Sequence, residues 1–262
     1  MTNQFETTLL QHLPEAVLKG LPQHLLDVPR QITDITGIHV LVKPLRKEDF
    51  AFASGWDRAP ALLDIDPRGQ TITIFVGDAE ITTAEIGHEL IHLRRAVLES
   101  IPRLIPGFDA HPSIKGNILG YENELEHLFV IPEEIRTFPD AENRWVEHYR
   151  HLITRAAERG AREDLMFAYA QLRNSLPNQI DLGRTLVDHL RGCGGDWLRD
   201  ADYLREDFKQ AMQDKNALHA LIQTNCPSLL SHMGTARFSA EKGYLGVESL
   251  SFAGEVYSDE DE

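Results

Sequence analysis

The sequence predicts an α+β fold, with a small β-sheet and several helices followed by a mostly helical C-terminal region. Short apolar runs at 38–42, 61–65 and 71–76, two of them rich in β-branched residues, have the composition of strands. They lie among segments whose apolar residues recur at helical spacing. From Asp140 onward, helical patterns dominate the chain.

The N-terminal segment is expected to be helical. Apolar residues recur at helical spacing over 4–27, and we expect breaks at Pro14 and Pro22. A second short helix should end at Gly37, and the first strand follows it.

The next two strands should form a hairpin. Runs 61–65 and 71–76 flank a turn that contains Pro67 and Gly69. A connection at 46–60 precedes this hairpin, and a helical pattern follows it after a few residues.

The rest of the chain is read as loop and helix. A loop or lid rich in Pro and Gly is expected at 101–117, followed by a helix from Ile118 to Ile131 that Pro132 stops. After a helix that Asp140 could cap, further helices are expected at 162–175, 181–191, 203–213 and 216–223. The expected domains are a catalytic domain, a helical region and a C-terminal segment with an acidic tail, at 1–139, 140–235 and 236–262.

The acidic composition of the chain limits the kinds of partner that it can bind. The formal net charge is -15 and the pI is about 5.2, which argues against nucleic acid or an anionic membrane as the main partner. The sequence has no apolar run of membrane-helix length, and its start lacks the pattern of a signal peptide. Cys193 and Cys226 occur singly, so we expect neither a disulfide framework nor a thiolate metal cluster, and a cytoplasmic protein is the simplest interpretation.

A motif for metal chemistry lies in the helical pattern after the hairpin. His88 and His92 are four residues apart, so a helix places both imidazoles on one face, where they can bind one zinc ion. Glu89 then projects beside the metal, where a general base is needed. Thr82 and Glu85 have the spacing of a capping box, which predicts a helix start just before the motif. The alternative is two incidental histidines on a core helix.

A third zinc ligand is expected from the helix at 118–131. Catalytic zinc usually has three protein ligands and one position for water. Glu122 falls near the middle of that helix's apolar face, where a carboxylate is costly unless it is paired or bound to metal. Glu126, one turn later, would hydrogen-bond a ligand imidazole, or the two roles could be exchanged. Two histidines are weaker candidates. His127 falls on the opposite side of this helix, and His111 lies in the expected loop. The alternative is that both glutamates are simply exposed.

This arrangement resembles the gluzincin branch of the zinc metallopeptidases, in which a Glu on a downstream helix is the third ligand. His88, Glu89, His92, Glu122 and Glu126 match that order. The resemblance implies a zincin-like catalytic domain in which Glu89 takes a proton from a water on zinc.

Within that branch, the chain is most similar to the ImmA/IrrE-type peptidases. The shared features are the hairpin before the motif helix and an Asn followed nine residues later by Pro, here Asn123 and Pro132. That family usually has its ligand four residues before the Asn, where this chain has Leu119.

The sequence therefore predicts a zinc-dependent endopeptidase that hydrolyses a cytoplasmic protein or peptide substrate. Zn²⁺ is the expected cofactor, and neither nucleic acid nor a membrane is an expected partner. Two alternatives remain open: a zinc amidohydrolase that is not a peptidase, and a non-catalytic helical interaction protein.

Overall fold

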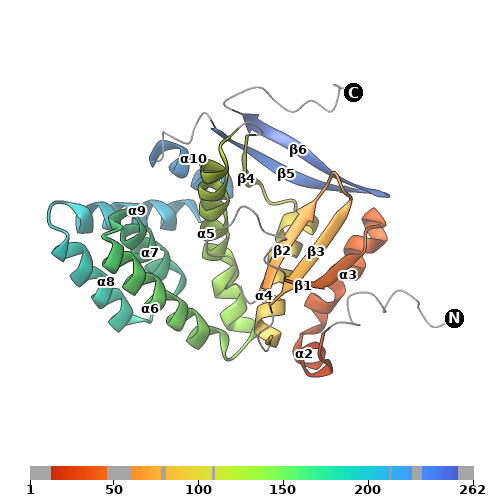
Figure 1. The fold of residues 1–262 in the computed structure, drawn as a ribbon, viewed down its shortest axis with the longest axis horizontal. Coiled ribbons are helices and arrows are strands. Elements are labelled where there is room, and N and C mark those ends of the chain that lie inside the picture. Colours follow the sequence, from red (N-terminus) through yellow and green to blue (C-terminus); the bar gives the residue numbers. More distant parts are fainter. Residues whose placement is uncertain are drawn as a thin grey trace. The chain divides into compact units, whose positions relative to one another are not determined.

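The structure, a computed structural model, has a mixed α+β fold with two three-stranded sheets (Figure 1). It describes residues 13–45, 61–77, 81–107, 110–212, 214–225 and 232–252. The described residues fall into two compact units. Unit 1 comprises Met1–Glu122 and Cys226–Glu262, and unit 2 comprises Asn123–Asn225.

Unit 1 begins with two helices and a mixed sheet. Helices α2 (Glu15–Gly20) and α3 (Gln23–Thr36) precede β1 (Val40–Pro44), and Gly37 ends α3 in the left-handed region at φ 73°. Strands β2 (Ala61–Asp66) and β3 (Thr71–Val76) form the expected antiparallel hairpin. The sheet order is β1-β3-β2, with β1 parallel to β3.

The central strand of this sheet is covered on both faces. Ile72, Thr73 and Ile74 of β3 are all buried in succession, whereas a half-exposed strand would alternate. Strand β2, at the sheet edge, contacts the helix that carries the histidine motif.

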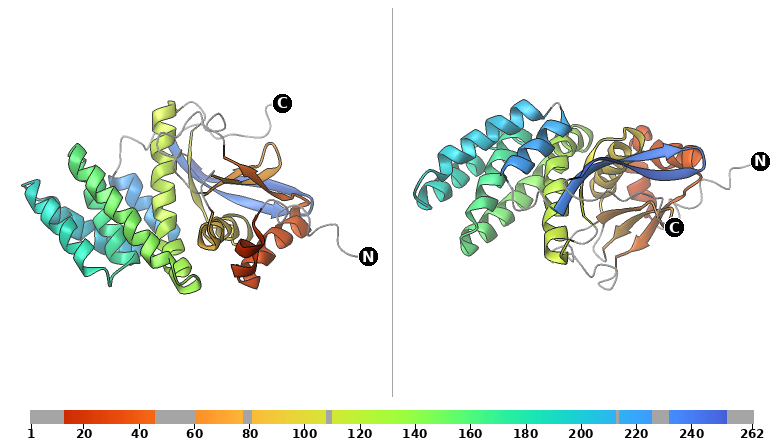
Figure 2. Two further views of the ribbon diagram at one scale, coloured as in Figure 1. Left: turned by 60° about the horizontal axis from the view of Figure 1, so that its bottom comes forward. Right: turned by 90° about the horizontal axis from the view of Figure 1, so that it is seen from above.

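The second sheet joins distant parts of the sequence. Strand β4 (Arg103–Pro106) pairs with β5 (Met233–Glu241), which forms a hairpin with β6 (Tyr244–Phe252). The C-terminal strands thus return to unit 1, and Figure 2 shows them as a long twisted ribbon. Helix α3 contacts strands of both sheets and so ties them together.

Unit 2 is helical. It contains the later part of α5 (Pro112–Thr137), followed by α6 (Ala141–Arg159), α7 (Arg162–Ser175), α8 (Ile180–Gly192), α9 (Trp197–Ala211) and α10 (Lys215–Asn225) (Figure 2). Its apolar core includes Ile131, Tyr149, Leu172 and Leu186.

Helix α5 differs most from the sequence expectation. It begins at Pro112 and continues through Pro132 to Thr137, and the segment expected to be a loop also contains β4. An interior proline costs about 3 kcal/mol. Leu128, Val130 and Ile131 are fully buried, at about 1.5–3 kcal/mol each, so their burial outweighs that cost.

The units also differ from the expected domains. The structure divides the chain within α5, after Glu122, rather than near residue 139, and it places β5 and β6 with unit 1. The expected connection at 46–60, the start of the N-terminal helix and the acidic tail lie outside the described residues.

Candidate metal centre

The motif helix, α4 (Thr83–Leu93), starts with the expected capping box. The Glu85 amide donates to Oγ1 of Thr82 at 3.3 Å, and the Thr82 amide donates to Oε2 of Glu85 at 2.7 Å. Ile86, Leu90, Ile91 and Leu93 are fully buried. Packing on this scale fixes the rotation of α4 about its axis, and hence the direction of its polar side chains.

A π-helical turn, η4 (Arg94–Leu98), continues α4 directly. The Glu99 amide donates to the Arg94 carbonyl at 3.0 Å, and Ser100 then takes a positive φ of 49°. π-helical turns are rare in proteins, and those that occur often lie at functional sites.

The two motif histidines converge. Their Nε2 atoms are 3.1 Å apart, their ring centroids are 4.6 Å apart, and the rings are inclined by 75°. In a tetrahedral zinc site with Zn–N of about 2.0–2.1 Å, two ligand nitrogens lie about 3.3 Å apart. The spacing of His88 and His92 therefore suits a shared metal ion.

Glu89, the expected general base, is buried on the same helix with an exposed fraction of 8%. His92 is buried at 4%, and His88 is partly exposed. The motif thus combines two convergent imidazoles with a carboxylate largely removed from solvent.

A third histidine completes the group. His88, His92 and His127 each offer one ligand atom, and these atoms all lie within 4.8 Å of one another. Three imidazoles can hold a metal ion, and His₃ is a known donor set for catalytic zinc. Within the described part of the chain, these three histidines are the group whose ligand atoms lie this close together. Neither Glu122 nor Glu126 belongs to the group.

The expectation that His127 points away from the site treated this helix as having a single apolar face. In the structure Leu125, Leu128, Val130 and Ile131 are all buried around His127, so this part of the helix is covered on several sides. The run of apolar residues after His127 was the available signal, since a helix that is apolar all round is buried all round.

Glu122, the preferred third ligand from sequence, is 2% exposed and is bound by unit 1. Its Oε1 accepts from Nε of Arg103 at 3.0 Å, and its Oε2 accepts from the Leu104 amide at 2.8 Å. The predicted cost of a carboxylate at this position is thus offset in part by an arginine and a backbone amide of β4.

Glu126, the other carboxylate considered, is 1% exposed and belongs to unit 2. Nζ of Lys215, itself buried at the start of α10, lies 2.7 Å from Oε1 of Glu126. Each of the two glutamates therefore has a cationic partner.

His127 has a polar neighbour in unit 2. Its Nδ1 lies 3.7 Å from Oε2 of Glu124. Burial would raise the pKa of Glu124, but the neighbouring His127 ring, a hydrogen bond from Gln171 and the charge of His148 together hold this pKa below its usual range. Burial is also the main cause that lowers the pKa of His148 and raises that of Tyr149.

His111, the remaining candidate from sequence, is exposed at the start of α5. Its Nδ1 lies 2.8 Å from Oγ of Ser113 and also accepts from the Ser113 amide at 3.3 Å. The second contact gives a hydrogen-bond acceptor to a backbone amide in the first turn of α5, which has no partner within the helix.

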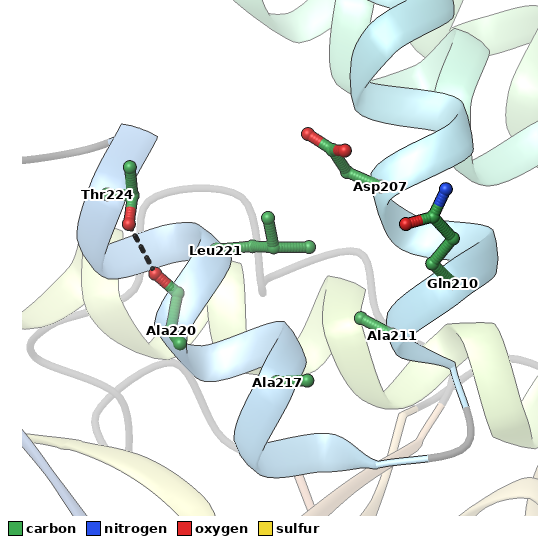
Figure 3. A pocket seen from close by; sticks show the side chains of 7 residues that line it. All are labelled: Asp207, Gln210, Ala211, Ala217, Ala220, Leu221 and Thr224. Carbon is green, nitrogen blue, oxygen red and sulfur yellow. Dashed lines mark hydrogen bonds between the residues drawn. The ribbon is translucent and has the colours of Figure 1, made fainter.

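A separate groove of about 350 Å³ lies between α9 and α10 in unit 2 (Figure 3). It is lined by Asp207, Gln210, Ala211, Ala217, Ala220, Leu221 and Thr224. None of the histidines or glutamates discussed above lines it.

No helix in the described ranges is long and apolar enough to cross a membrane. Comparisons of the chain with protein-family models, curated proteins and solved structures gave no match.

Proposed function

We propose that this chain is a zinc-dependent endopeptidase in which His88, His92 and His127 hold the metal and Glu89 is the general base. The observation that carries the proposal is the convergence of three histidine nitrogens, two of them from the helix that also carries Glu89. The donor set fits zinc, because neutral imidazoles are among its usual ligands. Glu122 and Glu126 then serve as structural anchors.

A zinc ion held there would polarise a carbonyl oxygen and make a water molecule acidic enough to attack at neutral pH. The contribution of the chain is to place bases and donors around that chemistry. The Glu89 carboxylate accepts a proton from the attacking water and returns it to the leaving amine. Burial of this carboxylate removes competing solvent, which strengthens its interactions in the reaction.

Strand β2 supports a peptide as the substrate. Within the described residues it has a strand neighbour on one side only, and it contacts α4. An extended peptide can add to such an edge through backbone hydrogen bonds, which would bring a peptide bond to the metal helix. A small amide would have no use for this edge, so we favour the peptidase over the amidohydrolase.

The first test is metal content. We expect about one zinc per chain in the purified protein. His88→Ala, His92→Ala and His127→Ala should each lose it, whereas His151→Ala, at an exposed position on α6, should retain it. A protein without zinc, or a His127→Ala variant that binds it as well as the natural chain, would contradict the proposed ligand set.

Glu122→Gln separates the two possibilities for the third ligand. Zinc should be retained, because Glu122 is bound to Arg103 and the Leu104 amide. Loss of zinc in Glu122→Gln together with its retention in His127→Ala would restore the arrangement expected from the family resemblance.

The second test is hydrolysis. Glu89→Gln should keep the metal and lose turnover, since an amide cannot accept the proton. A peptide library from a digested proteome can be incubated with either protein, and new termini identified by mass spectrometry. New termini with the natural chain but not with Glu89→Gln support a peptidase; equal patterns with a zinc-loaded protein would exclude it.

A further inference from the structure

The ring of His127 lies between Glu124, from its own helix α5, and Trp145, from α6 of the same unit. On one side, Oε2 of Glu124 lies 3.7 Å from Nδ1 of the ring. On another, the indole of Trp145 meets the ring edge to face, with centroids 4.9 Å apart and an angle of 68°. Trp145 is itself fixed, because its Nε1–H donates to Oε2 of the fully buried Glu134 at 2.8 Å.

The Glu124 carboxylate is fixed in turn by a chain of hydrogen bonds. Nε2 of Gln171 donates to Oε2 of Glu124 at 2.7 Å and to the Glu124 carbonyl at 2.8 Å. The Tyr149 hydroxyl donates to Oε1 of Gln171 at 2.7 Å. Gln171 is 2% exposed and Tyr149 is fully buried, so this chain runs through the interior of unit 2.

The donors and acceptors in this chain of hydrogen bonds all point the same way, from Tyr149 toward Glu124. Tyr149 donates to the Gln171 carbonyl, which leaves the Gln171 amide to donate to Glu124. The carboxylate therefore presents its acceptor capacity to Nδ1 of His127. An imidazole whose Nδ1 carries the proton has its lone pair on Nε2, which is then the nitrogen available to a metal.

We propose that Glu124 is a positioning residue for the metal centre, and that it fixes the tautomer and rotation of His127 so that Nε2 faces the ion. This inference rests on the proposed function, because it needs His127 to be a ligand. The 3.7 Å between Nδ1 and Oε2 exceeds a hydrogen-bond distance of about 2.7–3.2 Å, so the proposed contact requires the carboxylate to move closer to the ring. Carboxylates that orient ligand histidines in this way typically change metal affinity by about 10–100-fold.

This inference gives the helical unit a role in metal binding. Tyr149 lies on α6 and Gln171 on α7, so two helices that carry no proposed ligand determine the orientation of one. A peptidase domain that ended after α5 would lack both.

The test compares Glu124→Gln with a matched variant, Glu142→Gln. Glu142 also accepts a hydrogen bond from a glutamine amide in unit 2, Nε2 of Gln179 at 2.6 Å. Both substitutions remove a charge from a carboxylate on such a bond, but only Glu124 faces His127. Zinc dissociation constants are measured by competition with a chromogenic chelator, and each variant is also loaded with Co²⁺ to record its visible absorption spectrum.

We expect Glu124→Gln to weaken zinc binding by about tenfold and to shift the cobalt absorption, and Glu142→Gln to change neither. Glu124→Asp, which keeps the charge but withdraws the carboxylate from Nδ1, should change both in the same direction. It also serves as the test if Glu124→Gln does not fold. Zinc affinity and a cobalt spectrum like those of the natural chain in a Glu124 variant would overturn the positioning role.

The outcome is distinguishable from failure of the proposed function. If His127→Ala loses the metal while the Glu124 variants bind it normally, the metal site stands and the positioning role fails. If the natural chain binds no zinc or cobalt at all, both fail.

Discussion

The motif helix of unit 1 and the helices of unit 2 find partners for their polar side chains in different ways. In unit 1 the motif helix uses neighbours in sequence: Thr82 caps Glu85, and His88 faces His92. In unit 2 the partners come from separate helices, as Gln171 reaches Glu124 and Lys215 reaches Glu126. Two of the three proposed ligands are therefore placed by the local geometry of one helix, whereas the surroundings of the third depend on the packing of helices far apart in the sequence.

Local contacts and contacts between helices differ in how much stability is lost when a mutation removes them. A local contact such as a cap is formed by the helix itself, and its loss costs little. A buried ion pair between helices costs more to break, because the remaining charge has no water to solvate it. We therefore expect the polar anchors of unit 2 to have larger energetic effects than those of unit 1.

The largest effect is expected at Lys215, whose side chain is 4% exposed beside Glu126. Lys215→Met should lower the free energy of unfolding by about 3–5 kcal/mol, since it removes the ammonium group that lies 2.7 Å from the buried Glu126 carboxylate. Urea denaturation followed by far-ultraviolet circular dichroism measures the change. The double variant Lys215→Met with Glu126→Leu should recover most of the loss, and a single variant that costs under about 1 kcal/mol would remove the contrast between the units.

A smaller effect is expected at Glu122 in unit 1. Glu122→Gln should cost about 1.5–3 kcal/mol, because charge-assisted bonds to Arg103 and the Leu104 amide become neutral and one amide group faces a donor. The same denaturation experiment applies. A cost above that of Lys215→Met would mean that unit 1 also depends on its tertiary anchor, and the two regions would not differ as proposed.

The capping box should contribute less. Thr82→Ala should cost about 1 kcal/mol, since the Glu85 amide loses its acceptor. Thr82→Ser retains the hydroxyl and should remain close to the natural protein. Equal losses in both variants would show that the methyl group, rather than the cap, is responsible.

The smallest effect is expected for an exposed ion pair on the β5–β6 hairpin. Nε of Arg237 lies 2.7 Å from Oε2 of Glu248, and both side chains are about half exposed. Solvent screens such pairs, so Arg237→Ala should change the free energy of unfolding by less than about 1 kcal/mol. A thermal unfolding scan in low and high salt checks this, and a larger, salt-sensitive loss would indicate a wider charge network.

Sequence reasoning succeeded where the controlling contacts are local. The hairpin at β2 and β3 follows from two strand-like runs and the turn residues between them, and the start of α4 follows from Thr82 and Glu85. It did not anticipate that α5 continues through Pro132, that β4 lies within the expected loop, or that the C-terminal strands return to unit 1. Those features depend on contacts between residues far apart in the sequence.

The sequence by itself determined the motif: on any α-helix, residues four apart share a face, so His88 and His92 converge once the helix forms. The tertiary structure alone decided which residue of α5 joins them. Glu122, Glu126 and His127 are all buried, and packing assigns the glutamates to Arg103 and Lys215. The physical reason is that the 100° rotation per residue fixes positions around one helix axis, whereas the partners of each face are set by the other elements of the fold.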